Sequence, residues 1–489
     1  DQPVETNSFR YYGYDDEIKF HQQVDYLSTF PTFQGILGNA YIPRFGEIGS
    51  RNNRMVSFFG NLAYTFKNRY ILTASARKDA SNTFGIATNK RWNPLWSVGL
   101  GWELSKEKFL SDLDFVDNLK LRSTWGHSGN SGGIGSAEPI ISIMAAPSNG
   151  LSPDPEGLIS SMPYIDLKWE DVRMFNIGLD FHLFNSRLSG SLEYFDKKST
   201  DLLANDPLEP TTGMLSMTRN VANMRGSGFD VSITSRNIQN RFFWTTNFYI
   251  SMAKDKVTEF YGNEGQAKDI LPSRGTNLQP TLNRSLYPVF AFHSKGLDKE
   301  GDPLGIYQGE VTKDYQQLTS DSLKNIKYFG SALPRFHGAI RNTFSFRGLT
   351  LNVNLVYKFG NYFVNNSISY TNLINGWEGH RDARYRWKNP GDEQLTTIPS
   401  LKLPLNSSRD LFYQFSEVLV EPAGLLRIQD INLSVPLRLN KQVGINIFCS
   451  VNNVGILWRQ NRRGVDPENL SLPSPRSYTC GITFKPNLR

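Results

Sequence analysis

The stretch VGINIFCSVNNV, residues 443–454, decides the fold class of this 489-residue chain. Its alternate members are apolar, namely Val443, Ile445, Ile447, Cys449 and Val451. The residues between them are mostly small or polar, among them Asn446, Ser450 and Asn452. Because the side chains of a β-strand point alternately to its two faces, this stretch predicts a strand with one apolar face and one wet face.

The same alternation recurs in pairs of segments joined by two-residue turns. MFNIGLDFHLF (174–184) precedes RLSGSLEYFDKK (187–198), and RFHGAIRNTFSF (335–346) precedes LTLNVNLVYKF (349–359). The pairs alternate with long connections, at about 129–170, 200–225, 256–334, 361–423 and 454–474. Short turns at one end and long loops at the other are typical of a transmembrane antiparallel β-barrel, whose strands of about ten residues are apolar toward lipid and polar toward the lumen. A soluble sandwich or propeller is disfavoured, because the loops are very unequal and no blade-length repeat occurs.

Counting the alternating segments gives about 13 strands. We expect them at 53–66, 69–79, 93–104, 119–128, 171–184, 186–199, 226–236, 241–255, 335–347, 348–360, 424–436, 441–453 and 475–485. Aromatic residues near predicted strand ends suggest an interfacial girdle, with simple packing as the alternative: Tyr64, Phe66, Trp102, Trp125 and Tyr357.

The strand count also bears on completeness. Tight turns mark the periplasmic end, so residues 1–52 are expected to form an extracellular loop segment. Complete bacterial barrels have an even number of strands. The sequence therefore predicts that residues 53–489 are the C-terminal part of a larger outer-membrane barrel, with long extracellular loops.

Composition excludes two other classes of protein. The net charge is +7, but the Lys and Arg residues are scattered, and the longest basic cluster is the short WRQNRRG at 458–464. No nucleic-acid partner is expected from this pattern. No run approaches the roughly 18 to 20 apolar residues of a membrane-spanning helix, so the chain does not read as a helical membrane protein.

Several longer segments resemble one family when taken together and in order. They are NRYILTASARKDASNTFG (68–85), RWNPLWSVGLGWELSKEKFL (91–110), NLKLRSTWGHSGNSG (118–132), the stretch 167–203, the stretch 334–361, GLLRIQDINLSVPLRL (424–439) and PSPRSYTCGITF (473–484). From about residue 53 onward, the chain resembles the SusC/RagA family of TonB-dependent outer-membrane transporters of Bacteroidota.

The resemblance implies a plugged barrel of 22 strands, of which this chain would supply the last thirteen. The family's plug domain and TonB-contacting box have no counterpart in the sequence, so the plug and the N-terminal barrel portion are expected outside this chain. The implied partners are a SusD-like surface lipoprotein, TonB acting through that plug, and the lipid of a Gram-negative outer membrane. The implied activity is import of oligosaccharides or oligopeptides.

A different class of function stays open, a passive porin or structural barrel without a plug. About 16 strands would then close on themselves, and LYPVFAFHSKG (286–296) would count as a strand.

Residues with enzymatic spacing are scarce. None of the six His forms an HExxH pair, and GNSGGIGS (129–136) lacks the Lys-Ser/Thr of a phosphate-binding loop. We predict no catalytic residues, no cofactor and no metal site, and so no enzyme. DKEGD (298–302) has oxygen ligands that could hold Ca²⁺, but an ordinary acidic turn is favoured. Cys449 and Cys480 are expected as neighbouring lipid-facing hydrophobes rather than a disulfide.

Binding is the more plausible chemistry, and one loop offers it. WEGHRDARYRW (377–387) places three aromatic side chains beside three guanidinium groups: Trp377, Tyr385 and Trp387 with Arg381, Arg384 and Arg386. Aromatic faces suit sugar rings or peptide side chains, and Arg suits carboxylates. This loop is the candidate for contact with substrate or partner. Because RWKNPGDE resembles a family-wide segment, a structural role or contact with the partner lipoprotein is favoured over substrate binding.

Overall fold

The structure is a computed structural model of the whole chain. It describes residues 2–9, 12–25, 28–32, 38–42, 46–81, 92–130, 140–144, 156–162, 164, 166–214, 216–262, 265–376, 378–438, 443–470 and 474–486.

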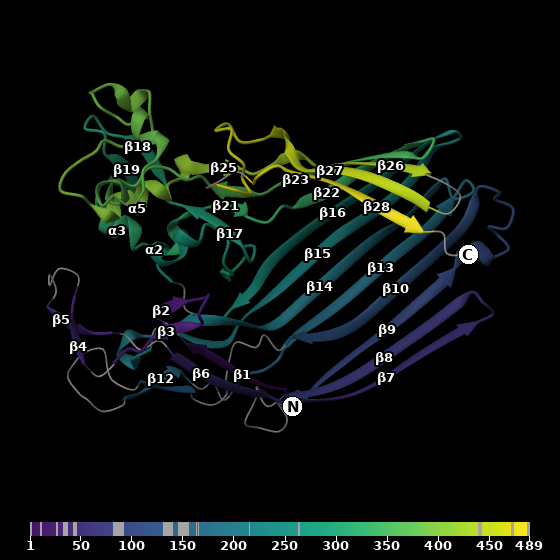
Figure 1. Cartoon of the computed structure of the whole chain (residues 1–489), viewed down its shortest axis with the longest axis horizontal. Helices are drawn as coiled ribbons and strands as arrows, with labels where there is room; N and C mark the ends of the chain where they lie inside the picture. Colours follow the sequence, from purple (N-terminus) through teal and green to yellow (C-terminus); the bar gives the residue numbers. More distant parts are fainter. Residues whose placement is uncertain are drawn as a thin grey trace.

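One antiparallel sheet of thirteen strands dominates the molecule. Each strand pairs with its neighbours in chain order, so the sheet is a meander without crossovers. Its strands are β7 (Met55–Phe66), β8 (Tyr70–Ser81), β9 (Trp92–Glu103), β10 (Val116–Asn130), β13 (Glu170–Leu183), β14 (Leu188–Pro207), β15 (Ser216–Gln239), β16 (Phe242–Phe260), β22 (Phe336–Phe346), β23 (Leu349–Phe359), β26 (Leu425–Arg438), β27 (Val443–Arg459) and β28 (Ser477–Pro486). Figure 1 shows a curved wall with the tight turns at one end, here called the turn end, and the long connections at the other, the loop end.

The thirteen predicted strands are confirmed, and the sheet does not close on itself. Among the described strands, β7 and β28 each have a neighbour on one side only. A fold of this kind is part of a larger barrel, because closure is what removes the edges of a membrane-spanning sheet. The prediction for 200–225 was wrong. β14 and β15 continue through most of it as a tall hairpin of 20-residue and 24-residue strands, far longer than the roughly ten residues needed to cross a bilayer.

Strand register sorts the quoted stretch into the two predicted faces. Ile447 lies opposite Val435 and Ile482, and Cys449 lies opposite Leu433 and Cys480. On the other face, Asn446 accepts a hydrogen bond from the Ser434 hydroxyl at 2.8 Å. We call these the apolar face and the polar face of the sheet. Both cysteines are free, as the sequence predicted.

Polar-face side chains satisfy one another across strands. Asn354 Nδ2 donates to Asp430 at 3.0 Å, and the Thr343 hydroxyl donates to Asn352 at 2.6 Å. On the apolar face, Tyr70 stacks on Trp102 beside the turn end, with ring centroids 6.2 Å apart. Tyr357, in contrast, is nearly buried and its hydroxyl donates to the Tyr249 carbonyl at 2.9 Å, so it packs between strands.

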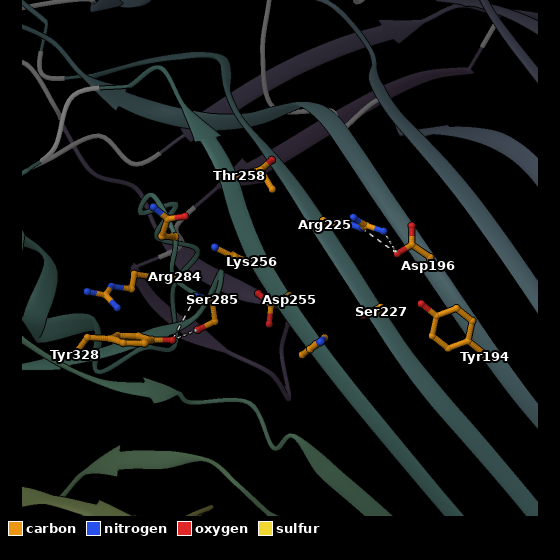
Figure 2. A pocket seen from close by; sticks show the side chains of 12 residues that line it. Tyr194, Asp196, Arg225, Ser227, Asp255, Lys256, Thr258, Arg284, Ser285 and Tyr328 are labelled. Carbon is orange, nitrogen blue, oxygen red and sulfur yellow. Dashed lines mark hydrogen bonds and ion pairs between the residues drawn. The ribbon is translucent and has the colours of Figure 1, made fainter.

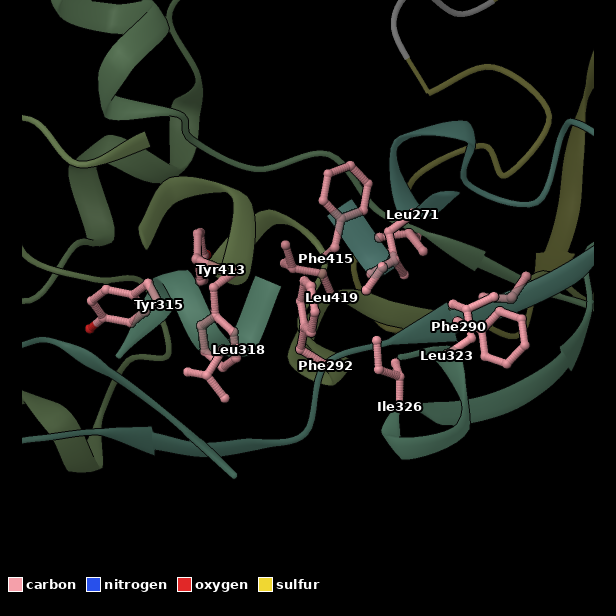
Figure 3. Packing of buried hydrophobic residues seen from close by; sticks show 14 of the residues in the cluster. Leu271, Phe290, Phe292, Tyr315, Leu318, Leu323, Ile326, Tyr413, Phe415 and Leu419 are labelled. Carbon is pink, nitrogen blue, oxygen red and sulfur yellow. The ribbon is translucent and has the colours of Figure 1, made fainter. Parts of the chain in front are cut away.

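At the loop end, the two longest connections fold together into one compact unit. We call this unit, residues 265–333 and 361–424, the loop module. Its core joins aromatic residues from both connections, among them Phe292, Tyr315 and Tyr413 (Figure 3). Phe412 is fully buried, and its ring centroid lies 5.4 Å from that of Phe292 and 5.9 Å from that of Tyr315. The sequence had suggested only loops there, and the segment 286–296 is not a barrel strand. Its β17 (Pro288–Ala291) is buried and pairs with β21 (Lys327–Ser331) inside the module.

The other elements are short. Small sheets pair β1 (Gln2–Phe9) with β6 (Gly46–Asn53), β2 (Tyr12–Asp15) with β3 (Phe20–Gln22), β4 (Thr29–Pro31) with β5 (Asn39–Tyr41), β11 (Ile140–Met144) with β12 (Glu156–Ser161), β18 (Ser294–Leu297) with β19 (Pro303–Tyr307) and β20 (Glu310–Thr312), and β24 (Tyr362–Val364) with β25 (Val420–Pro422). The α-helices are α2 (Ala267–Ile270), α3 (Tyr315–Thr319), α4 (Tyr370–Ile374) and α5 (Ser407–Gln414). Single 3₁₀ turns are η2 (Leu104–Lys106), η3 (Pro210–Thr212), η4 (Leu271–Ser273), η5 (Leu323–Asn325), η6 (Arg381–Tyr385), η7 (Asp392–Gln394) and η8 (Glu417–Leu419). Within the described ranges, no helix has both the length and the apolar character to cross a membrane.

Candidate functional site

The candidate loop 377–387 lies on the loop module, and the structure divides its residues into two groups. Arg381, Arg384 and Tyr385 belong to η6 and are exposed, with 68% of Tyr385 accessible to solvent. Trp377 lies outside the described residues. The exposed group therefore presents two guanidinium forks and one phenol ring to solvent, a combination suited to carboxylates and flat rings.

The second group, Arg386 and Trp387, is held by the module itself. Arg386 Nη1 donates to the Ala383 carbonyl at 2.9 Å. Trp387 Nε1 donates to Glu393 at 3.1 Å, and its indole lies against Gly301, where an added Cβ would come within 2.6 Å of the ring. The hydrogen bond from Trp387 lowers the pKa of Glu393, which keeps the acceptor ionised. These two residues fix the loop rather than offer a binding surface.

A buried carboxylate anchors the loop from beneath. Asp382 Oδ2 accepts a hydrogen bond from the Ser367 hydroxyl at 2.6 Å and lies 3.7 Å from Arg463 Nη1. Arg463 comes from the connection after β27, and it also donates to the Val418 carbonyl at 3.2 Å. Three separate chain segments thus meet at Asp382. The pairing of Asp382 with Arg463 was not predicted from the sequence, where the basic run at 458–464 was its sole signal.

Two buried tyrosines line the same region as neutral hydrogen-bonding groups. Burial raises the pKa of Tyr370 to about 12, and its hydroxyl donates to the Pro399 carbonyl at 2.6 Å. Burial also raises the pKa of Tyr413, whose hydroxyl lies 2.9 Å from that of Ser367. Both hydroxyls stay protonated at neutral pH, so they stabilise the module through hydrogen bonds.

The acidic turn at 298–302 is part of an ion-pair network. Oxygens of Asp298, Glu300 and Asp302 lie within 4.8 Å of one another. Cations already contact all three: Lys313 is 2.8 Å from Asp298, Lys402 is 3.0 Å from Glu300 and 2.7 Å from Asp302, and Arg409 is 3.0 Å from Asp302. The carboxylates therefore connect α5 with the segments that carry Lys313 and Lys402.

Charged side chains also gather on the polar face of the sheet. Arg122 donates through Nε to Asp180 at 3.1 Å and through Nη2 to Glu193 on the next strand. Lys120 pairs with Glu103 at 3.1 Å on the neighbouring strand. Asp230 lies opposite Glu193 in the register of β14 and β15. In a barrel this face lines the interior, so a polar, hydrogen-bonded wall surrounds whatever fills or crosses it.

Comparison with known proteins settles what kind of barrel this is. A family model described as "TonB dependent receptor-like, beta-barrel" matches residues 2–284. The chain belongs to this family. TonB-dependent receptor barrels are outer-membrane folds, so the apolar face of the sheet faces lipid and the polar face lines the lumen.

Individual relatives give the same result for this TonB-dependent receptor barrel. TonB-dependent receptor P39 of Formosa agariphila is 26% identical over 518 residues, covering 94% of this chain and 47% of the relative. TonB-dependent receptor SusC of Bacteroides thetaiotaomicron is 26% identical, covering 88% and 43%. A solved structure of the RagAB peptide transporter shares the fold with a TM-score of 0.73 at 22% identity, covering 90% of this chain and 48% of that one. The chain thus spans about half the length of the relatives it matches.

Proposed function

We propose that this chain is the C-terminal barrel part of a SusC-like TonB-dependent transporter, which imports oligosaccharides or oligopeptides across the outer membrane of a Gram-negative bacterium. A SusD-like surface lipoprotein works with it at the extracellular mouth. TonB acts through a plug that is not in this chain, and the N-terminal barrel portion completes the wall. Residues 1–52 belong to the extracellular side, and residues 53–489 form the barrel with its loops.

The observation that carries this proposal is the unclosed thirteen-strand wall of a TonB-dependent receptor barrel. Its lumenal side carries paired charges, among them Arg122 with Asp180, instead of the apolar packing that fills a soluble sandwich. Such a wall requires further strands to close into a barrel. Its charged inner side suits a lumen that is filled by polar groups or water. The match to the RagAB peptide transporter supports a peptide cargo, and an oligosaccharide cargo rests on the resemblance to the SusC/RagA family alone.

The loop module is the proposed contact with cargo or with the lipoprotein. It stands at the loop end, beyond the apolar band, and its exposed Arg381, Arg384 and Tyr385 face solvent. Arg and Tyr are enriched among residues that dominate binding energy at interfaces. The buried anchor at Asp382 keeps these side chains in one place, which lowers the entropy lost on binding.

Uptake in the native bacterium tests the proposal. The gene that encodes this chain is deleted, and growth is measured on oligosaccharide mixtures and on oligopeptide mixtures, with and without functional TonB. Loss of growth on one class, restored by the wild-type gene only when TonB works, supports the importer. Uptake that persists without TonB would instead favour a passive porin. Native mass spectrometry of the detergent-extracted particle then shows whether a plug-bearing portion and a lipoprotein accompany the barrel.

A further inference from the structure

A basic groove lies on the lipid-facing side of the sheet, where the apolar band ends toward the loop end. Its cavity of about 660 Å³ is lined by β14, β15 and β16 and by the segment 283–285 (Figure 2). The lining includes four cationic side chains, which are Arg225, Lys254, Lys256 and Arg284. Two carboxylates, Asp196 and Asp255, also line it. The cations outnumber the carboxylates, so the groove carries a net positive charge.

Two of these cations have no partner in the described part of the chain. Arg225 pairs with Asp196 at 2.9 Å, and Arg284 lies over the Tyr328 ring, 4.6 Å from its centroid. Lys254 and Lys256 are exposed on the same face of β16, and no described residue forms a hydrogen bond or ion pair with either. The intervening Asp255 also borders the cavity, but its carboxylate accepts a hydrogen bond from the Leu286 backbone N–H at 2.6 Å.

A second cavity continues the groove into the apolar band. It measures about 280 Å³ and shares Tyr194, Ser227 and Lys254 with the first cavity. Phe229 and Met252, which lie opposite each other in the register of β15 and β16, give it an apolar floor, and Arg335 also lines it. The surface therefore changes from cationic to apolar between two successive side chains on the same face of each strand.

Strand register places that step at the edge of the membrane. Ile177, Tyr194, Phe229 and Met252 form one row across four neighbouring strands of the lipid-facing side. The next row toward the loop end contains Phe175, Asp196, Ser227 and Lys254, and Arg173 follows on β13. Charged side chains begin where the hydrocarbon ends, so the groove lies at the level of the outer-leaflet headgroups.

We propose that this groove binds the phosphorylated headgroup of an outer-leaflet lipid. Lys254, Lys256 and Arg284 contact the phosphate, and an acyl chain lies on Phe229 and Met252. Cationic side chains suit phosphate oxygens, and long Lys side chains reach the headgroup level from apolar surface. A free phosphate ion would use the upper cavity alone, whereas an amphiphile matches the whole groove. The site goes beyond the proposed import, because it lies on the outer wall of the barrel.

Lipid retention by the whole particle tests this site. The detergent-extracted complex is placed in nanodiscs of phosphatidylethanolamine with a minor fraction of bisphosphorylated lipid A, and retained lipid A is counted by native mass spectrometry after delipidation. The triple variant Lys254→Gln, Lys256→Gln and Arg284→Gln should lose retention by about tenfold or more. A matched variant removes the same charge from exposed lysines of the loop module, Lys268→Gln, Lys299→Gln and Lys388→Gln, and should retain lipid A like the wild type.

Three further results would overturn the proposal. Equal retention by the triple variant, with folding verified by heat-modifiable migration on a gel, removes the role of the cations. Equal retention of a dephosphorylated lipid A shows that phosphate is not recognised. Displacement of lipid A by inorganic pyrophosphate at equal concentration shows that the groove takes a soluble anion rather than a lipid.

Discussion

Asp382 and Arg463 lie 3.7 Å apart although they belong to different loops, one after β23 and the other after β27. Asp382 is nearly buried, and it also accepts the Ser367 hydroxyl. A carboxylate with partners from two other segments is held more firmly than one with a single surface pair. The exposed binding candidates Arg381 and Arg384 flank it, so their position depends on this contact.

Removing the anchor should therefore loosen the loop. Asp382→Ala removes one hydrogen-bond acceptor of the Ser367 hydroxyl and the carboxylate that faces Arg463, at a cost of about 1–3 kcal/mol to the module. We expect faster protease cutting within 377–387 in intact cells, with the barrel still folded. Lys388→Ala, at an exposed position of the same segment, should leave cutting unchanged. Identical cutting of the Asp382 variant and the wild type would contradict the anchoring role.

The exposed half of the loop should matter for binding and not for folding. The double variant Arg384→Ala and Tyr385→Ala removes a charged group and an aromatic ring that are both exposed to solvent. Barrel assembly should therefore be normal. Uptake of a fluorescent oligosaccharide or oligopeptide, or retention of the lipoprotein, should fall by about tenfold, as expected for interface Arg and Tyr residues. Leu395→Ala, which changes an 85% exposed side chain nearby, serves as the control. If uptake and retention both persist, the loop is not the contact surface.

Two glycines of the loop module offer a matched steric test. Gly301 has φ +76° and would place a Cβ within 2.6 Å of the Trp387 ring, whereas Gly296 has φ +83° and nothing within 4 Å. Both Gly→Ala variants bear the strain of a positive φ, about 1 kcal/mol. Only Gly301→Ala must also displace the indole. The urea concentration at which half of the module is unfolded, measured by proteolysis of the module, should therefore be clearly lower for Gly301→Ala than for Gly296→Ala. Equal midpoints would show that Trp387 moves freely.

The thirteen strands could be predicted because their signal is local. Each membrane-crossing strand must alternate apolar and polar residues, as in 174–184, and two-residue turns such as 185–186 fix the pairing. The same logic explains the error at 200–225. β14 and β15 continue there beyond the lipid, where no face has to be apolar, so the pairing persists without the pattern.

The loop module could not be predicted by this route. Phe292 and Phe412 come from two different connections and contact each other in its core. No short-range periodicity in the sequence predicts this contact. The candidate loop was found by its composition, yet composition did not show that Trp387 packs on Gly301 while Tyr385 is exposed. Contacts between residues far apart in sequence decide such roles, and Asp382 with Arg463 is a case in point.

Acid should weaken the ion-pair network around Asp298. Burial raises the pKa of Asp298, but the hydrogen bonds from Lys313 and from the backbone N–H groups of Asp302 and Glu300 outweigh burial and hold the pKa below its ordinary value of 3.8. A carboxyl group with a lowered pKa in the folded state stabilises the protein above its unfolded pKa, and this stability is lost as the pH falls through the lower folded value. Proteolysis of the module should therefore accelerate below about pH 4. Asp298→Asn should be less stable at neutral pH and less sensitive to acid, and an unchanged acid response would contradict the assignment.

Two neighbouring residues of β27 test which side of the wall faces lipid. Ile447 lies between Val435 and Ile482 on the apolar face, whereas Asn446 bonds to Ser434 on the polar face. A lysine on the lipid side near the bilayer midplane costs about 2–4 kcal/mol, and one in the lumen is hydrated. Ile447→Lys should thus sharply reduce the heat-modifiable folded fraction in the outer membrane, and Asn446→Lys should reduce it little. The opposite order would mean that the two faces of the barrel are exchanged, and an equal loss would mean that neither side of β27 is in contact with water.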